Sequence, residues 1–233
     1  MYTNPKKIVD KALGKNMKVI LSYWESASSR NGTIDDVNQF WCVWQTVVNK
    51  YGSNGNVFFE PMNEPHGYTL AQLTSIYAEW LSRYHNVTKG RIILDGSGYS
   101  ENVNSIGSDS RFSSCLLALH NYAYWANRTQ SGWEADWRSR YGNFASRTVV
   151  TEFGATMTTG KNYTGAAGND NEIAYIVGAT NVFRNDRVAS VYWPGLRDND
   201  TYSIQRRGGS GTNITLTTTN ASGVSRIRYG WGL

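Results

Sequence analysis

Short apolar runs alternate along the chain with longer segments in which apolar residues recur every three or four positions. The short runs are typical of buried strands and begin near residues 17, 57, 91, 116, 148 and 189. The longer segments predict helices at Pro5–Lys15, Val37–Tyr51, Leu70–Tyr84, near Trp133–Tyr141 and at Asn171–Phe183. Because a parallel crossover needs a connection of helical length, this alternation predicts an α/β fold with helices outside a parallel sheet.

Local signals mark one helix start and the C-terminal end. Thr33-x-x-Asp36 has the form of a capping box, which predicts a helix start. Asn213–Thr219 alternates apolar and polar residues and predicts a short edge strand or hairpin arm, after a flexible turn at Gly208–Gly211. Ala221–Trp231 predicts a final short helix. We interpret this end as a closing flap on a single domain covering residues 1–233.

The composition is that of an ordered globular chain with one sizeable core. Of its 233 residues, 40% are hydrophobic and 13% aromatic, including nine Trp and fifteen Tyr. Most of these rings are expected in the core, but flat aromatic faces also stack on sugar rings. The net charge of +5 comes without any long basic run, so it argues against a nucleic-acid partner.

No segment has the pattern of a membrane anchor or a leader. The chain has no apolar run long enough to cross a bilayer, and Met1–Asn4 leads directly into a polar helix without the features of a signal peptide. Cys42 and Cys115 lack metal-ligand spacing, and their positions in a helix and a strand predict two buried thiols rather than a disulfide.

The first candidate for chemistry is the pair Asn63 and Glu64. The strand-forming residues before it end at Pro61, so the pair follows the carboxyl end of a strand. A rigidly held carboxylate with an amide beside it suits acid/base catalysis. The alternative is a solvated glutamate in a strand-to-helix connection. A second carboxylate, Glu152, favours the catalytic interpretation because it also ends a β-branched run.

Two further strand ends carry polar or aromatic residues: His120 and Tyr122 follow one apolar run, and Trp193 ends another. The ordered set Asn-Glu, His-x-Tyr, Glu and Trp resembles the cellulase-type family 5 glycoside hydrolases, over a span from about Asn4 to about Tyr202. This resemblance implies a (β/α)₈ TIM barrel, which keeps its active site after the carboxyl ends of the strands.

The resemblance also implies roles for the site residues. Glu64 matches the family's acid/base and Glu152 its nucleophile. The remaining substrate-binding residues are Asn63 at the sugar 2-hydroxyl, His120 and Tyr122 beside the glutamates, and Trp193 as a platform under the sugar. Trp24 and Trp125 are weaker stacking candidates, chosen by position alone. No cofactor is expected. Arg197–Asp200 and Asp95–Gly96 could suggest calcium, but neither fits a calcium-loop spacing, so we interpret them as solvated turns and expect no metal.

The chain also departs from the family. It shows about six βα units where the barrel has eight, so we expect an incomplete barrel lacking the first two strands. The family's supporting arginine on the second strand therefore cannot be located, and Tyr23-Trp24-Glu25 stands where the third strand usually ends in histidine. An open barrel leaves strand edges uncovered, which predicts association of copies.

The sequence thus predicts a retaining β-glycanase acting on a β-linked polysaccharide. Cellulose or another β-1,4-glucan is the first expected substrate, and mannan, xylan and galactan are alternatives. An alternative is a truncated barrel that binds carbohydrate with weak or no turnover, and a third is a structural fragment that requires a partner. An extracellular location is expected from the resemblance alone.

Overall fold

The computed structural model of the protein describes residues 5–26 and 28–233. The chain forms two compact units, residues 1–118 and 119–233, and each is described by itself. Residues 1–4 lie outside the described residues. The expected absence of a signal peptide and the start of the family resemblance both fall on them. The organisation of residues 1–233 as one domain stays a prediction.

The first unit is built on parallel strands. They are β1 (Val19–Ser22), β2 (Val57–Glu60), β3 (Ile93–Asp95) and the start of β4 (Leu116–His120). β1 pairs with β2 and β3 with β4, and a bridge from Phe59 to Ile92 joins the two pairs. The alternation of strands and helices read from the sequence is therefore confirmed in this unit. The expectation that the first strand is buried is wrong, because β1 is only half-buried along its length.

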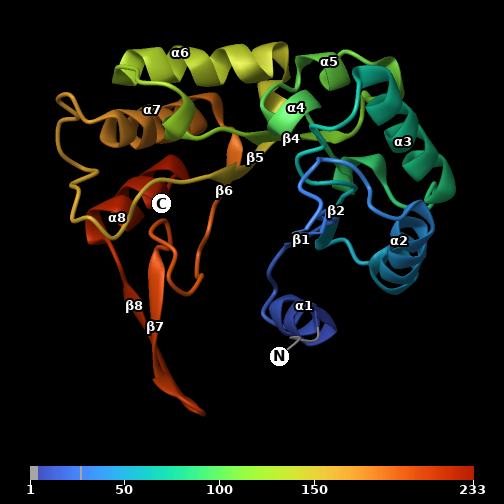
Figure 1. The fold of residues 1–233 in the computed structure, drawn as a ribbon, viewed down its shortest axis with the longest axis horizontal. Helices are drawn as coiled ribbons and strands as arrows, with labels where there is room; N and C mark the ends of the chain where they lie inside the picture. Colours follow the sequence, from blue (N-terminus) through green and yellow to red (C-terminus); the bar gives the residue numbers. More distant parts are fainter. Residues whose placement is uncertain (1–4, 27) are drawn as a thin grey trace. The chain divides into compact units, whose positions relative to one another are not determined.

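Helices flank these strands. They are α1 (Pro5–Leu13), α2 (Val37–Tyr51), α3 (Leu70–Arg83), α4 (Ser97–Ser100) and α5 (Asn104–Gly107), with 3₁₀ turns at Lys89–Arg91 and Ser110–Phe112. Figure 1 shows α2 and α3 on the outer side of β2. Trp44 of α2 and Trp80 of α3 meet edge to face with ring centroids 5.4 Å apart, and both contact the Phe59 ring of β2. This aromatic cluster joins the two helices to the strand.

Two local predictions in α2 are wrong. The helix begins at Val37, and its N-cap is Asp36, whose side chain accepts the backbone N–H of Gln39. Thr33 instead donates its hydroxyl to Asn31, because the chain turns before the helix starts. Cys42 is exposed rather than buried, since it lies on the outer face of the helix, whereas Cys115 is buried as expected.

The second unit has a parallel strand pair, a hairpin and three long helices. Its elements are α6 (Gln130–Tyr141), β5 (Thr148–Phe153), α7 (Asn171–Asp186), β6 (Ala189–Tyr192), β7 (Gln205–Ser210), β8 (Asn213–Thr218) and α8 (Ala221–Gly230), with 3₁₀ turns at Ala123–Trp125 and Gly142–Arg147. α7 packs between α6 and α8 (Figure 1). The fully buried rings of Trp133, Trp137 and Tyr175 fill the α6–α7 interface.

The C-terminal hairpin confirms the predicted arm. β7 and β8 pair antiparallel from Gln205–Thr218 to Ser210–Asn213, and every residue of β8 is exposed. The arm extends away from the helices of its unit (Figure 1). The flexible turn expected at Gly208–Gly211 is wrong in part, because Gly208 to Ser210 belong to β7. The final helix is confirmed, with Ile227 buried. None of the described helices is long and apolar enough to span a bilayer.

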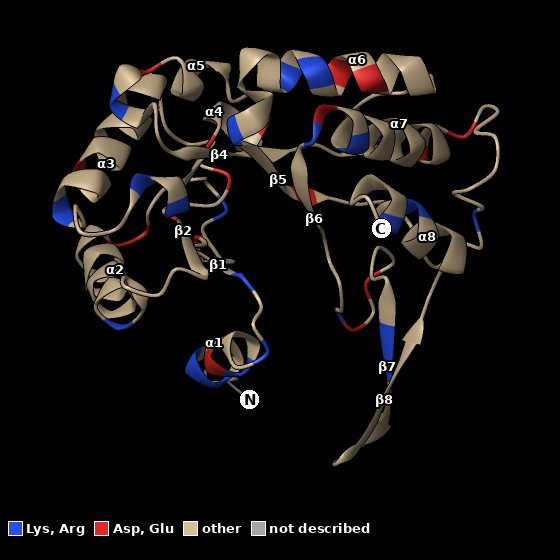
Figure 2. Cartoon of the chain, turned by 180° about the vertical axis from the view of Figure 1, so that it is seen from behind, with Lys and Arg blue, Asp and Glu red and all other residues tan. Residues whose placement is uncertain are grey.

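An ionic contact ties α6 to α7 in the second unit. α6 carries both acidic and basic side chains (Figure 2). The Arg138 Nε atom donates to Asp186 Oδ2 at 2.9 Å, and the Tyr141 hydroxyl donates to the same oxygen. Burial alone would raise the pKa of Asp186, but the hydrogen bonds from Arg138 and Tyr141 hold that pKa below its ordinary value. The ionised carboxylate is therefore stabilised by the fold.

We expect Asp186→Asn to lower the free energy of unfolding by about 1–2 kcal/mol at pH 7, since it replaces charge-assisted hydrogen bonds. A carboxyl whose pKa is lowered by folding contributes stability above its unfolded pKa, and this contribution is lost as the pH falls through the folded value. The difference between wild type and variant should therefore shrink below about pH 4. Urea denaturation at pH 7 and pH 3 measures this difference in the free energy of unfolding. The control is Asp198→Asn, which removes the carboxylate of an exposed ion pair. Equal stabilities at pH 7 would contradict the account.

Candidate active site

Glu152 lies in an irregular part of β5. The pairing of β5 with β6 runs from Val150–Ser190 to Phe153–Tyr192, so two residues of β5, Thr151 and Glu152, face one residue of β6. This is a β-bulge, a feature that re-aims side chains and recurs next to active sites. In a regular strand the two side chains would point to opposite faces, whereas here both contact side chains at or just after the carboxyl end of β4.

Those residues are His120 and Tyr122. The Tyr122 hydroxyl donates to Glu152 Oε2 at 2.7 Å, and His120 Nε2 lies 2.9 Å from Thr151 Oγ1. The other ring nitrogen, His120 Nδ1, lies 3.8 Å from Glu152 Oε2. Glu152 is 7% exposed and His120 1%. A buried carboxylate that accepts a phenolic hydrogen bond is fixed in direction, as a nucleophile requires.

Predicted aromatic platforms lie at the edge of this group. Trp125 is 43% exposed and donates its indole N–H to Asn121 Oδ1 at 3.3 Å. The Asn121 amide in turn donates to Asp136 Oδ2 at 2.9 Å. Trp193 is half-buried, and its backbone N–H donates to the carbonyl of Phe153. The structure therefore places Trp125 and Trp193 in the same unit as Glu152, with Trp125 held by a buried amide that sequence reasoning missed.

Gly154 explains how closely the segment after β5 approaches the end of β6. A Cβ atom at this position would lie 2.3 Å from the carbonyl oxygen of Trp193, a distance that real side chains do not adopt. Only glycine therefore fits at this position beside the Trp193 backbone. The Glu-Phe-Gly sequence carries this signal, although its physical reason emerges only from the packing.

The remaining predicted residues belong to the first unit. Asn63 is buried, and its backbone N–H donates to the carbonyl of Tyr23 at 2.8 Å. Glu64 is half-buried and has a φ of 47°, in the left-handed region that non-glycine residues rarely adopt. Trp24 is 49% exposed and follows β1. As predicted from the sequence, Asn63 and Glu64 thus follow the carboxyl end of β2.

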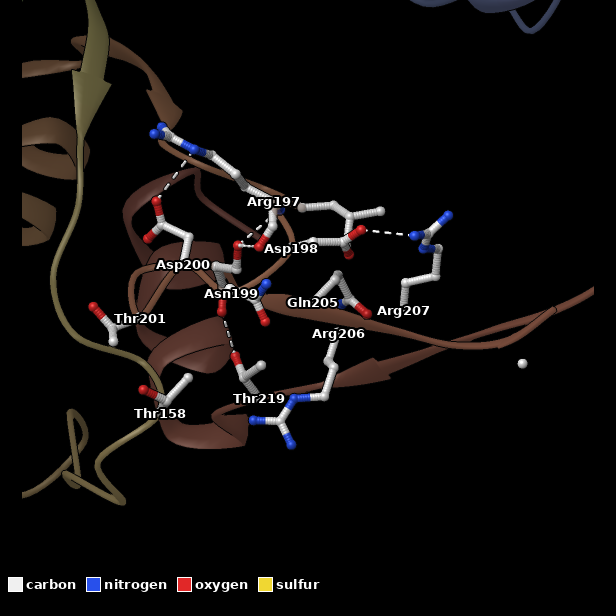
Figure 3. A pocket seen from close by; sticks show the side chains of 13 residues that line it. Thr158, Arg197, Asp198, Asn199, Asp200, Thr201, Gln205, Arg206, Arg207 and Thr219 are labelled. Carbon is white, nitrogen blue, oxygen red and sulfur yellow. Dashed lines mark hydrogen bonds and ion pairs between the residues drawn. The ribbon is translucent and has the colours of Figure 1, made fainter. Parts of the chain in front are cut away.

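A polar pocket of about 590 Å³ lies beyond Trp193, between the loop after β6 and the hairpin (Figure 3). Arg207 Nη2 lies 2.7 Å from Asp198 Oδ2, and Arg197 Nε lies 3.5 Å from Asp200 Oδ2. In the sequence, Arg197–Asp200 fits no calcium-loop spacing, and the hairpin pairing that brings Arg207 to it has no local signal. The lack of a metal or cofactor stays a prediction.

Comparison with known proteins adds a family match. Residues 1–195 match the profile of Cellulase (glycosyl hydrolase family 5). Endoglucanase Z of Dickeya dadantii (strain 3937) is 28% identical over 121 residues, which are 51% of this chain and 27% of that protein. The chain thus spans about a quarter of the length of the curated relative that it matches.

Solved structures agree on the fold. XacCel5A in complex with cellopentaose superposes with a TM-score of 0.66 at 13% identity, covering 96% of this chain and 77% of that one. Thermotoga maritima Cel5A in complex with mannotriose gives a TM-score of 0.64 at 15% identity, covering 85% and 71%. The predicted barrel-type α/β fold is therefore confirmed over the matched part of these chains.

Proposed function

This chain belongs to glycosyl hydrolase family 5, the cellulase family, and on that basis we propose that it is a retaining β-glycanase, first of all an endo-β-1,4-glucanase. In this proposal Glu152 is the nucleophile and Glu64 the acid/base. Asn63, His120 and the aromatic residues named above bind the polysaccharide.

One observation carries the proposal: Glu152 is buried, lies in a β-bulge and accepts the Tyr122 hydroxyl at 2.7 Å. The bulge turns the Glu152 side chain toward the residues at the end of β4, and the Tyr122 hydroxyl fixes the direction of its Oε2 atom. This arrangement supports a nucleophilic role.

The proposed reaction has two steps. In the first, a Glu152 oxygen bonds to the anomeric carbon while the glycosidic C–O bond breaks and Glu64 gives its proton to the leaving oxygen. In the second, Glu64 takes a proton from water, the water oxygen bonds to the anomeric carbon and the ester to Glu152 breaks. This double displacement requires the two carboxyl groups to lie about 5–5.5 Å apart in the working enzyme.

Sugar binding follows from the remaining residues. Asn63 would hydrogen-bond the 2-hydroxyl, a contact that strengthens in the transition state. Trp193 would stack beneath the sugar at the cleavage site, and the exposed faces of Trp24 and Trp125 would extend the platform. The contact with Thr151 would fix the His120 ring so that its other nitrogen faces the nucleophile.

The substrate is tested by reducing-sugar release from carboxymethylcellulose, with mannan, xylan and galactan alongside. XacCel5A has been solved in complex with cellopentaose and Thermotoga maritima Cel5A in complex with mannotriose, which favours a β-1,4-linked glucan first and mannan second. Sugar release from one of the four polysaccharides would identify the substrate class. No release from any of the four would overturn the catalytic proposal for this chain.

A second candidate is a carbohydrate-binding barrel without turnover. The exposure of Trp24 and Trp125, at 49% and 43%, favours it, because such faces bind sugar whether or not a bond is broken. Retarded migration in polysaccharide gels without sugar release would identify it. If the chain shows no retarded migration and no sugar release, the third candidate is favoured, a structural fragment that requires a partner. Association of copies and an extracellular location stay predictions.

Tyr122→Phe isolates the contact to the nucleophile. We expect kcat/KM on carboxymethylcellulose to fall about tenfold to hundredfold, because a hydrogen bond to a charged group is worth about 1.5–3 kcal/mol. The thermal midpoint should change little, since the ring stays in place. Tyr229→Phe, on the surface of α8, is the matched control and should keep wild-type kcat/KM. An unchanged kcat/KM in Tyr122→Phe would contradict a role for this hydrogen bond in catalysis.

A further inference from the structure

A fully buried carboxylate in the first unit has no role in the account above. Asp95 ends β3 and is 0% exposed. Its Oδ1 atom accepts two hydrogen bonds, from the Ser100 hydroxyl at 2.5 Å and from the backbone N–H of Glu64 at 3.2 Å. The Tyr77 hydroxyl also donates to the Asp95 carbonyl at 3.0 Å, which fixes the end of the strand. Asp95 is therefore held rigidly, and it holds the backbone of Glu64.

Glu64 needs such support because its backbone is unfavourable. With a φ of 47°, it has the left-handed conformation that a side chain with a Cβ atom disfavours. Conformations of this kind persist only where the surroundings fix them, and they concentrate at functional sites. The carbonyl of Glu64 is occupied as well, since it accepts the backbone N–H of His66 at 2.7 Å.

The segment that follows Asp95 makes a second contact with the same turn. The Tyr99 ring stacks on the His66 ring, with centroids 4.0 Å apart and planes inclined by 17°. The next residue, Ser100, is fully buried and has a φ of 56°, which directs its hydroxyl to Asp95. Residues 95–100 therefore contact both ends of the turn at residues 64–66.

We infer that Asp95 is a positioning residue that sets the direction of the Glu64 carboxyl group. The inference rests on the proposed role of Glu64 as the acid/base. A general acid must reach the leaving oxygen within hydrogen-bond distance, and its side chain leaves the backbone in a direction that φ determines. Without the bond to Asp95, Glu64 relaxes toward an ordinary conformation and its carboxyl group moves away from that oxygen. Asp95 itself does not touch the reacting atoms.

The test compares two substrates with different needs for a proton. A cello-oligosaccharide has a sugar leaving group that requires protonation. An aryl β-cellobioside with a 2,4-dinitrophenyl group releases 2,4-dinitrophenolate, which leaves without protonation. In Asp95→Ala, we expect kcat/KM on cellotetraose to fall about hundredfold, the order of loss for a misplaced catalytic group, and kcat/KM on the aryl substrate to fall much less. The ratio of the two values is independent of the folded fraction, so a loss of stability cannot imitate the result.

Graded and control variants complete the test. Ser100→Ala removes the second donor to Asp95, and Asp95→Asn keeps an acceptor oxygen of the same shape, so both should lie between wild type and Asp95→Ala. Thr74→Ala removes a buried hydroxyl of α3 outside this network and should keep the wild-type ratio.

Three outcomes separate the inference from its premise. An altered ratio in both Glu64→Ala and Asp95→Ala supports the inference. An altered ratio in Glu64→Ala with a wild-type ratio in Asp95→Ala overturns the positioning role while the acid/base role stands. A wild-type ratio in Glu64→Ala, or no turnover of either substrate by the wild type, overturns the proposed function and the inference with it.

Discussion

Replacing Glu152 by glutamine is expected to reduce kcat/KM on carboxymethylcellulose about 10⁴-fold or more, the order of loss when a catalytic group is removed. Glutamine keeps the shape of the side chain and one acceptor for the Tyr122 hydroxyl, but its neutral amide cannot attack the anomeric carbon. The variant should fold normally, because the change removes a buried charge rather than packing volume. Reducing-sugar release and a thermal unfolding curve measure the two properties.

The matched control is Glu134→Gln on α6. Glu134 is also partly buried and accepts hydrogen bonds from Gln130 and Asn181, but nothing places it in the site. It should keep wild-type kcat/KM. If Glu152→Gln retained more than about a tenth of wild-type turnover, a loss far smaller than removal of a nucleophile causes, Glu152 could not be the nucleophile.

The second large effect is expected at Glu64. In Glu64→Ala, kcat/KM on cellotetraose should fall by about 10²–10⁴-fold, the usual contribution of general acid/base catalysis. Turnover of 2,4-dinitrophenyl β-cellobioside should then be limited by the second step, because no base activates the water. Azide needs no base, so it should raise kcat of this variant and yield a β-glycosyl azide.

Glu79→Gln provides the control for Glu64. Its side chain is exposed on α3 and pairs with Arg83, so its replacement should change neither substrate's kcat/KM, and azide should have no effect. A Glu64→Ala variant that azide does not accelerate, or that loses activity equally on both substrates, would contradict the acid/base assignment.

Much of the fold could be predicted because its signals are local. The strand runs and helical periods alternate along the chain. Of the residues proposed for the site, Asn63, Glu64 and Trp193 follow strands, and His120 and Glu152 lie near the carboxyl ends of theirs. Polar residues after the carboxyl ends of parallel strands point to a site whatever the loops do. The order of the motifs then identified the family.

The errors and omissions involve contacts between distant residues. Asp36, not Thr33, caps α2, and only the observed turn decides between two plausible caps. The β-bulge at Glu152 depends on the register of β5 against β6, which no local pattern encodes. Asp95 is an unremarkable strand-end residue until its bond to Glu64, 31 residues away in the sequence, is seen. Long-range pairing, unlike periodicity, has no signature within a short window.

Trapping the covalent intermediate would show whether Glu152 carries out a double displacement. A 2-deoxy-2-fluoro β-cellobioside with a dinitrophenyl leaving group should react with the wild type and slow the second step, because the fluorine destabilises the transition state. Intact-mass spectrometry is predicted to show one added fluorocellobiosyl unit, and the labelled peptide should carry it on Glu152. A chain that hydrolyses cellulose without forming the adduct, or that carries it on another residue, would contradict the account.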